Sequence, residues 1–341
     1  MPFEMGRPES NGNEAEEILS RAEELGARLA ELRTEIRRVI FGQREVVDLA
    51  LTGILSGGHV LLVGVPGLGK TRLVDTLGRT LGLATNRVQF TPDLMPADIL
   101  GSEVLDEVPE TGRRAFRFLP GPVFCQLLMA DEINRASPRT QSALLQAMQE
   151  GHIAVAGQDR PLPRPFHVLA TQNPIEQEGT YPLPEAQLDR FLLQIDLTYP
   201  GREDERAMLL ATTGSETAEA HAVLDTDQLV LAQRLVRAMP IGNAVVDGIL
   251  ALVRDGRPDG SGLGLVRDHV AWGPGPRAAQ ALMLATRARA LLDGRLSPSL
   301  EDVAALAPAV LRHRMALSFG ARAEGVTLEA VIDAMVGRIG A

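Results

Sequence analysis

The stretch HVLLVGVPGLGKT, residues 59–71, decides the fold of this chain of 341 residues. It begins with a short apolar run, which is typical of a strand buried on both faces, and a helix is expected from Lys70 to about Leu81. Between them lies G-x-x-x-x-G-K-T, the pattern of a phosphate-binding P-loop, whose glycines let backbone N–H groups turn toward phosphates. A Gly-rich turn that merely caps a helix is the alternative, but the flanking strand and helix favour the P-loop.

Lys70 is the only lysine in the sequence, and apart from histidine every other basic residue is arginine. A compact ammonium group fits inside a phosphate loop better than the wide planar guanidinium of arginine does. We expect Lys70 to reach the β- and γ-phosphates of a nucleotide and the hydroxyl of Thr71 to ligate Mg²⁺. The loop residues expected to bind the nucleotide are Gly64, Gly67, Leu68, Gly69, Lys70 and Thr71.

A second apolar run, LLMADE at residues 127–132, ends in two carboxylates. In a P-loop fold, an Asp at the carboxyl end of a strand holds Mg²⁺, which we expect of Asp131. Glu132 follows it directly and can polarise the attacking water as a general base, which suits hydrolysis. The alternative is a helix whose N-terminus carries acidic residues, but the P-loop favours the metal and base roles.

The rest of the chain divides into two parts of different character. Further strands are expected at 127–130, 166–170 and 191–195; they alternate with helices, which predicts a mostly parallel sheet covered on both sides. Two hairpins are expected, one from 102–105 and 115–119 around a turn at 109–112, and one from 152–155 to 162. An amphipathic helix is expected at 14–38. After residues 199–201 the pattern is helical, without a convincing strand, at 203–213, 226–238, 243–254, 276–292, 299–315 and 327–339.

Composition narrows the class of protein further. With 44 acidic against 34 basic residues the formal net charge is −10, which argues against a general nucleic-acid binder. The hydrophobic content of 45% is that of a folded protein, and the single cysteine excludes a disulfide scaffold. No uncharged apolar run is long enough to span a membrane, and the polar N-terminus lacks the apolar core of a signal peptide. A cytoplasmic protein without a membrane span is expected.

Five further stretches resemble the MoxR family of AAA+ ATPases. They are FTPDL at 90–94, GPVF at 121–124, ADEINRA at 130–136, QSALLQAMQE at 141–150 and ATQNP at 170–174. The resemblance runs from about residue 36 to the C-terminus and is densest in the first part. It implies an α/β fold: a P-loop AAA+ three-layer core with a parallel sheet and β-hairpin insertions, and an all-α C-terminal lid domain. The expected domains are an N-terminal helix at 1–35, the ATPase core at 36–198 and the lid at 199–341.

The resemblance also assigns roles close to the P-loop. Asn173 matches sensor 1, a polar side chain that positions water against the γ-phosphate, although an ordinary Asn-Pro turn is the alternative. Gln43, in Phe41-Gly42-Gln43, matches the segment on the adenine side of the nucleotide. A plain turn at the start of a helix competes with that interpretation.

Two arginines are assigned in the same way. Arg190 matches the arginine finger, which acts on the nucleotide of a neighbouring subunit and stabilises charge in the transition state. Its alternative is a surface salt bridge with Asp189 or Glu185. Arg277, which opens a helix, matches sensor 2 of the lid, and a solvated arginine is its alternative.

The function implied by the resemblance is ATP hydrolysis with Mg²⁺, used to remodel or mature a client protein. Assembly into a homo-oligomeric ring, expected to be a hexamer, follows from a finger that acts between subunits. The family also implies cofactor or metal insertion and a partner with a von Willebrand factor A domain. The hairpins would face the pore or a partner, with Arg113, Arg114 and Arg117 making the first one locally basic. A magnesium chelatase-type AAA+ motor subunit is the alternative function. A small-molecule kinase fits less well because a second acidic residue follows Asp131, and a nucleic-acid helicase fits less well because the net charge is negative.

Overall fold

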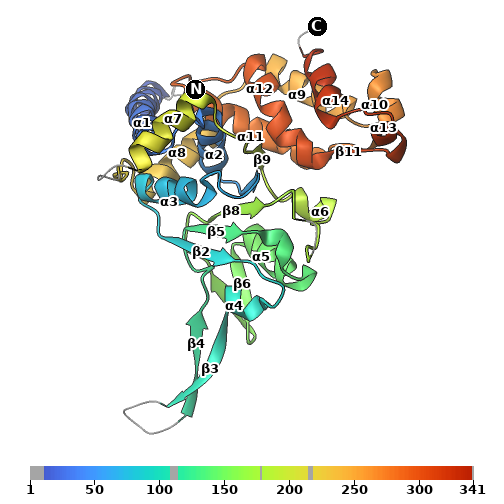
Figure 1. The fold of residues 1–341 in the computed structure, drawn as a ribbon. Coiled ribbons are helices and arrows are strands. Elements are labelled where there is room, and N and C mark those ends of the chain that lie inside the picture. Colours follow the sequence, from blue (N-terminus) through green and yellow to red (C-terminus); the bar gives the residue numbers. More distant parts are fainter. Residues whose placement is uncertain (1–10, 108–113, 177–178, 214–217, 340–341) are drawn as a thin grey trace, which may run out of the picture.

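The structure is a computed structural model, and it describes residues 11–107, 114–176, 179–213 and 218–339 (Figure 1). A five-stranded sheet forms the centre, in the order β2-β5-β8-β1-β9, and all four pairings are parallel. Its strands are β1 (Val60–Val63), β2 (Thr85–Gln89), β5 (Leu127–Asp131), β8 (His167–Gln172) and β9 (Leu193–Asp196). Because the strands are parallel, their carboxyl ends share one edge of the sheet.

Helices cover both faces of this sheet. Leu62 of β1 packs into one apolar cluster with α1 (Asn11–Val39), α2 (Arg44–Leu55) and α3 (Lys70–Thr80). Its neighbour Leu61 points into a second cluster with α4 (Pro96–Leu100) and α5 (Pro138–Glu150) on the opposite face. Successive side chains of a strand alternate between faces, so a strand covered on both sides must be apolar throughout, as this one is. The expected three-layer α/β core is confirmed.

Strand β2 was not expected from the sequence. Its residues, TNRVQ, are mostly polar and exposed, and only Val88 is buried. It lies at the edge of the sheet, where one side of the strand has no neighbour, so the apolar signal of a central strand is missing.

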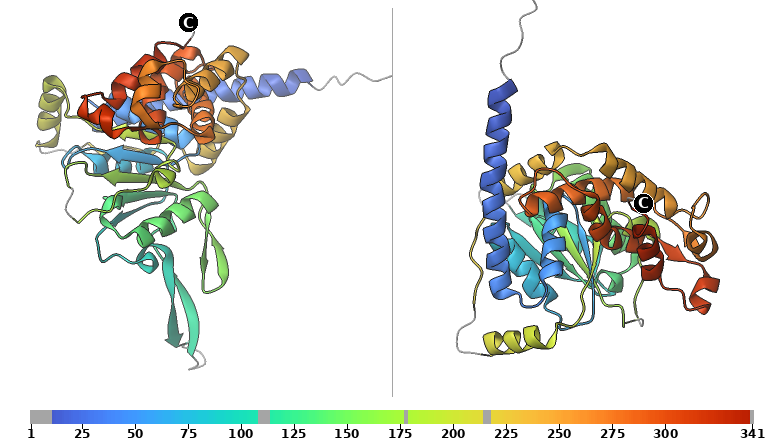
Figure 2. Two further views of the ribbon diagram at one scale, coloured as in Figure 1. Left: turned by 90° about the vertical axis from the view of Figure 1, so that its right-hand side faces the viewer. Right: turned by 90° about the horizontal axis from the view of Figure 1, so that it is seen from above.

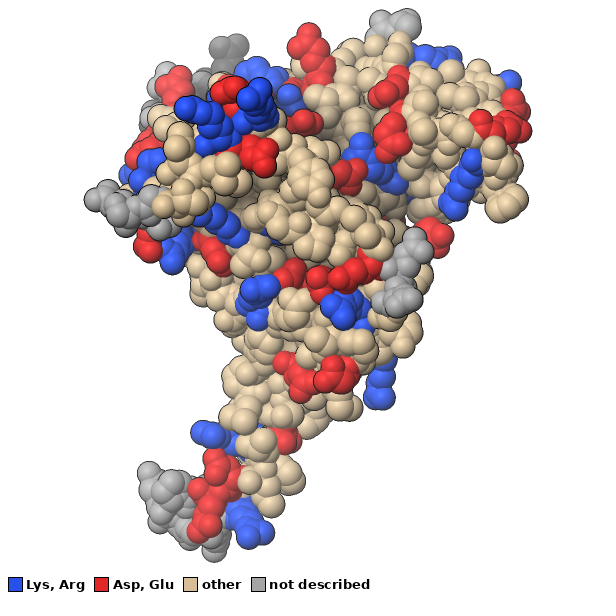
Figure 3. Space-filling view, viewed as in Figure 1, with Lys and Arg blue, Asp and Glu red and all other residues tan. Residues whose placement is uncertain are grey.

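Both expected hairpins are present. The longer one, β3 (Gly101–Glu107) with β4 (Arg114–Pro120), projects away from the core as an arm (Figure 1). The shorter one pairs β6 (His152–Val155) with β7 (Gln158–Pro161). The expected turn at 109–112 and Arg113 lie outside the described residues. Arg114 and Arg117 are exposed, but acidic residues lie among them and Arg117 pairs with Asp106, so the arm carries both signs of charge (Figure 3).

The C-terminal part is mainly helical, as expected, but it also contains two short helices and a small sheet that were not expected. The longer helices lie close to their expected bounds: α7 (Arg202–Thr212), α8 (Thr226–Ala238), α9 (Asn243–Asp255), α11 (Pro276–Leu292), α12 (Leu300–Leu311) and α14 (Leu328–Val336). Short helices α10 (Gly264–His269) and α13 (Phe319–Ala323) and a two-stranded antiparallel sheet of β10 (Val270–Trp272) and β11 (Ala316–Leu317) were missed. The expectation that this part has no strand is therefore wrong. Segments of two and three residues are too short to show an apolar alternation.

The helical part packs directly on the core. Helix α11 contacts α2 and α1, and α12 contacts β9. Figure 2 shows α1 running beside the body, with its N-terminal half extending beyond it. The expected division into 1–35, 36–198 and 199–341 stays a prediction; its first boundary falls inside the continuous helix α1.

Among the described residues no single helix has the length and apolar composition of a membrane span. Among the described residues, one pair of consecutive helices, α8 and α9, has this length and composition when taken together, but the two helices are bent by 89° relative to each other.

Candidate nucleotide-binding site

The P-loop is the connection between β1 and α3. Gly67 and Gly69 have φ angles of +86° and +75°, in the left-handed region that favours glycine, and Gly69 is the N-cap of α3. A side chain added at either glycine would meet nothing within 4 Å, so the conformation of the loop, rather than crowding, requires glycine. The loop is thus shaped to present backbone N–H groups to an anion at the N-terminus of α3.

Lys70 lies inside this loop. Its Nζ donates to the carbonyl oxygen of Gly64 at 2.6 Å, which spans the loop from its last residue to its first. Burial lowers the pKa of Lys70, and the nearby carboxylates of Asp131 and Glu132 act in the opposite direction. The ammonium group therefore lies between the loop and the acidic pair, as the P-loop interpretation requires.

Asp131 ends strand β5 and is fixed by two donors from neighbouring strands. Its Oδ1 accepts a hydrogen bond from Thr171 Oγ1 at 2.6 Å, and its Oδ2 accepts one from Arg87 Nη2 at 2.6 Å. Thr171 belongs to β8 and Arg87 to β2, on either side of β5. The carboxylate is therefore held at the carboxyl edge of the sheet, facing the same edge as the P-loop.

Glu132 follows in an unusual backbone conformation. Its φ of +55° lies in the left-handed region, which costs a non-glycine residue about 1–2 kcal/mol. The Glu132 N–H donates to Thr171 Oγ1 at 2.8 Å, so one threonine hydroxyl connects both acidic residues. The Oε2 atom of Glu132 accepts from Gln89 Nε2 at 2.8 Å and from Arg135 Nη1 at 3.2 Å. The carboxylate is thus oriented apart from that of Asp131, as separate metal and base roles require.

Asn173 lies at the same edge. It directly follows β8, whose last residue, Gln172, accepts a hydrogen bond from the N–H of Gly64 at 3.1 Å. Its side chain is 4% exposed, and its Oδ1 accepts from the N–H of Ile175 at 3.2 Å. The structure therefore brings Asn173, the acidic pair and the P-loop together at one edge of the sheet.

A cavity of about 310 Å³ adjoins the P-loop and is lined by its residues Pro66–Gly69. Gln43 lines it and donates from Nε2 to the carbonyl oxygen of Leu68 at 2.9 Å, which ties the start of α2 to the P-loop. The wall also contains the apolar side chains of Ile40, Phe41, Tyr199 and Met208. An apolar cavity beside a phosphate loop fits a nucleotide base. The assignment of Gln43 to the adenine side stays a prediction.

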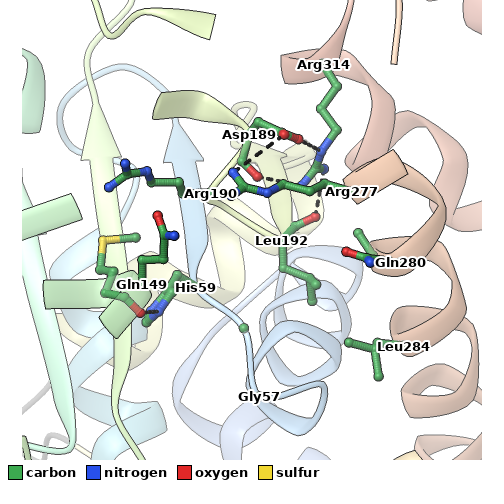
Figure 4. A pocket seen from close by; sticks show the side chains of 13 residues that line it. Gly57, His59, Gln149, Asp189, Arg190, Leu192, Arg277, Gln280, Leu284 and Arg314 are labelled. Carbon is green, nitrogen blue, oxygen red and sulfur yellow. Dashed lines mark hydrogen bonds and ion pairs between the residues drawn. The ribbon is translucent and has the colours of Figure 1, made fainter. Parts of the chain in front are cut away.

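Arg190 and Arg277 lie elsewhere, beside a second cavity of about 280 Å³ (Figure 4). Arg190 precedes β9, at the amino edge of the sheet, because Leu193 is in register with Val60 at the start of β1. The P-loop follows the other end of β1, and the four residues of that strand span about 13 Å. The structure therefore separates the expected site residues into two groups on opposite edges of the sheet.

Within the second group, an aspartate connects several arginines. Arg277 Nη1 is 3.7 Å from Asp189 Oδ2, and Arg314 Nε donates to Asp189 Oδ1 at 2.7 Å. Among the described residues the structure records no hydrogen bond or ion pair of the Arg190 side chain with Asp189 or Glu185. The salt bridge considered as the alternative for Arg190 is thus absent, because Asp189 is engaged by arginines from the helical part.

Four residues of these sites were missed by the sequence analysis: Arg87, Gln89, Thr171 and Arg314. The first two lie on β2, which was itself missed. Thr171 directly follows the apolar residues Val168–Ala170 of β8, the strand that pairs with LLMAD, and its polarity at a buried position was the one available signal. Arg314 was assigned to a helix, with no pattern to distinguish it from a surface arginine.

The residues fit a magnesium nucleotide. Among the described residues no group of three or more His, Cys, Asp or Glu side chains could hold a metal ion alone. Mg²⁺ commonly takes only one or two protein oxygens and obtains the others from phosphate and water. The oxygens of Asp131 and Thr71 are of that kind and number.

Comparisons with known proteins agree with this geometry. The ATPase family associated with various cellular activities (AAA) matches residues 59–193, and the AAA lid domain matches residues 264–335. The chaperone MoxR1 of Mycobacterium tuberculosis is 44% identical over 300 residues, which are 88% of this chain and 78% of that protein. The protein MoxR of Methylorubrum extorquens is 35% identical, with 84% of this chain and 87% of that protein covered. A crystal structure from Cytophaga hutchinsonii superposes with a TM-score of 0.89 at 35% identity, covering 96% of this chain and 99% of that one.

Proposed function

The chain belongs to the MoxR family of AAA ATPases, and from this premise we propose that it hydrolyses ATP with Mg²⁺ to remodel or mature client proteins. The observation that carries the proposal is the convergence of Lys70, Asp131, Glu132 and Asn173 at the carboxyl edge of one sheet. An ammonium group, two carboxylates and an amide, from the ends of two strands and the start of one helix, lie there beside a loop shaped for phosphate.

Each group has a distinct task in this proposal. The P-loop N–H groups and Lys70 bind the phosphates, while Thr71 and Asp131 would hold Mg²⁺, which supplies positive charge against the phosphate oxygens when bound. Glu132 accepts a proton from the attacking water, and Asn173 orients that water. In the present arrangement Glu132 is engaged by Gln89 and Arg135, so it must exchange at least one of these hydrogen bonds for one to water.

The separation of the two sheet edges supports an assembly in which subunits share sites. Arg190 lies about one strand length from the P-loop of its own chain, and Arg277 lines the same cavity as Arg190. Both are therefore better placed to meet the phosphates of a neighbouring subunit. A ring satisfies this need for every subunit at once, because head-to-tail contacts close by rotation. We propose a hexamer, with Arg190 as the finger and Arg277 as sensor 2.

The client and the place of action belong to the same proposal. A relative named as a chaperone supports action on other proteins. Cofactor or metal insertion into a client, a partner with a von Willebrand factor A domain and a cytoplasmic location are the more specific forms of this proposal. The projecting β3–β4 arm, with the side chains of Leu105 and Phe116 exposed and opposite each other, offers a surface for a partner.

The first experiment replaces the proposed base. Glu132→Gln keeps the size of the side chain and removes its ability to take a proton, so ATP binding should persist while hydrolysis falls by about 10²-fold or more. Binding is measured with a fluorescent ATP analogue and turnover by phosphate release. The matched control is Glu301→Gln, an exposed residue of α12. Turnover in Glu132→Gln equal to that of the control would exclude Glu132 as the base.

The second experiment tests the sharing of sites. Arg190→Ala should lose turnover by about 10³-fold while retaining ATP binding. Mixing it with Lys70→Ala subunits should restore part of the turnover, since one variant supplies an intact P-loop and the other an intact finger. Lack of recovery over a range of mixing ratios would contradict a finger that acts between subunits.

A further inference from the structure

Arg314 is among the most completely enclosed charged side chains of the described residues, with 2% of its side chain exposed. It lies in the short 3₁₀ turn Arg312–Arg314 that follows α12. Burial lowers the pKa of Arg314, which the hydrogen bond to Asp189 opposes. Burying a guanidinium costs free energy unless all its donors form hydrogen bonds, so the hydrogen-bond partners of Arg314 indicate its role.

Every donor of Arg314 is used. The guanidinium has five N–H groups, and it makes five hydrogen bonds at 2.5–3.3 Å. One goes to the carbonyl oxygen of Val310 in the preceding helix α12; the other four go to Asp189 Oδ1 and to the carbonyl oxygens of Asp189, Phe191 and Leu192. Four of the five bonds therefore bind one segment, residues 189–192.

That segment carries Arg190. His313, next to Arg314, adds a further contact from Nε2 to the carbonyl oxygen of Phe191 at 3.0 Å. The segment is thus attached to the helical part on both sides of the arginine proposed as the finger, whose own side chain is directed toward the cavity (Figure 4). A residue that only filled the core would not need to bind three of the four positions of one segment.

Asp189 extends the connection to Arg277. Its two carboxylate oxygens are divided, with Oδ1 bound by the buried Arg314 and Oδ2 near Arg277, whose side chain is 47% exposed. Arg277 is free to leave Asp189 for a phosphate, whereas Arg314 is not. Without Arg314, the Oδ1 atom of Asp189 would also be available, either to the adjacent Arg190 or as a second acceptor for Arg277, which would hold these arginines back from a phosphate.

We propose that Arg314 is a positioning residue that fixes the Arg190 segment to the helical lid and occupies Asp189, so that Arg190 and Arg277 face a neighbouring subunit as one unit. This inference rests on the proposed sharing of sites between subunits. It makes lid and finger move together, because the four hydrogen bonds run directly between them.

The test uses Arg314→Lys, which keeps the charge but has one nitrogen in place of a planar fork with five donors. Its own P-loop is intact, so its affinity for a fluorescent ATP analogue should stay within about twofold of the unaltered chain, while turnover falls by about tenfold or more. Mixing with Lys70→Ala subunits, which retain Arg314 and Arg190, should restore turnover as for Arg190→Ala. The matched control is Arg295→Lys, whose guanidinium binds Asp302 within the lid, and which should retain turnover.

A second variant covers the case in which Arg314→Lys does not fold. Asp189→Asn keeps an oxygen for Arg314 Nε but removes the charge, and it should show a smaller loss of turnover with the same recovery in mixtures. Turnover like that of Arg295→Lys in either folded variant would overturn the inference. The inference would also be overturned if Lys70→Ala subunits restored the turnover of Arg190→Ala but not that of Arg314→Lys or Asp189→Asn. The defect of these variants would then be one of folding. If Lys70→Ala subunits did not restore the turnover of Arg190→Ala, the proposal that subunits share sites would be overturned, and this inference with it.

Discussion

The hydroxyl of Thr171 connects the two acidic residues of the site, and its removal gives the most quantitative test of the geometry. Thr171→Val keeps the shape of the side chain, so it opens no cavity. Two hydrogen bonds are lost: one to the carboxylate of Asp131 at 2.6 Å and one from the N–H of Glu132 at 2.8 Å. The side chain is 0% exposed, so water cannot replace the hydroxyl without rearrangement.

The expected size follows from these contacts. A hydrogen bond to a charged group contributes about 1.5–3 kcal/mol and a neutral one about 1 kcal/mol, so the free energy of unfolding should fall by about 2.5–4 kcal/mol. The control is Thr286→Val, whose equally buried hydroxyl donates at 2.8 Å to the carbonyl oxygen of Leu282 in its own helix. That carbonyl is already bound within the helix, so the control should lose about 1 kcal/mol or less.

The assay is urea denaturation followed by circular dichroism on both variants and the unaltered chain. Because Thr171 also fixes Asp131 and the left-handed backbone of Glu132, the Mg²⁺ concentration for half-maximal phosphate release should rise in Thr171→Val alone. A loss of stability no greater than that of Thr286→Val would refute the assignment of both hydrogen bonds.

Two further predictions concern single groups. Lys70→Arg should weaken ATP binding by about tenfold or more in a fluorescence titration, because a guanidinium cannot occupy the place where Nζ lies 2.6 Å from the carbonyl oxygen of Gly64; unchanged affinity would contradict it. His59 accepts from the N–H of Val168 at Nδ1, and burial, followed by the nearby His167, lowers its pKa from 6.5 to about 4. The neutral ring is favoured in the fold, so stability is complete above pH 6.5 and about 1–3 kcal/mol is lost as the pH falls to 4. Denaturation curves at several pH values should show a smaller loss in His59→Asn, which keeps an acceptor, than in the unaltered chain. Part of the loss remains in the variant because burial also lowers the pKa of His167 and of His313. An equal loss of stability in both proteins would contradict the role of His59.

The core and the first group of site residues could be predicted because their signals are local. An apolar strand, a Gly-rich turn and a helix follow each other within residues 59–80, and the acidic pair ends its own apolar strand. The carboxyl ends of parallel strands must meet at one edge, so the convergence of Lys70, Asp131 and Asn173 followed from the fold class. The polar edge strand β2 gave no such signal, and its two site residues, Arg87 and Gln89, were missed with it.

The sequence by itself determined the P-loop core and which side chains lie along the sheet edge beside the loop, because local pattern and spacing specify them. Only the tertiary structure decided which arginines lie together. Residues 189, 190, 277 and 314 come from three elements that are far apart along the chain, and no periodicity relates them. Their meeting depends on how the helical lid packs against the amino edge of the sheet, and that packing is a property of the whole folded chain.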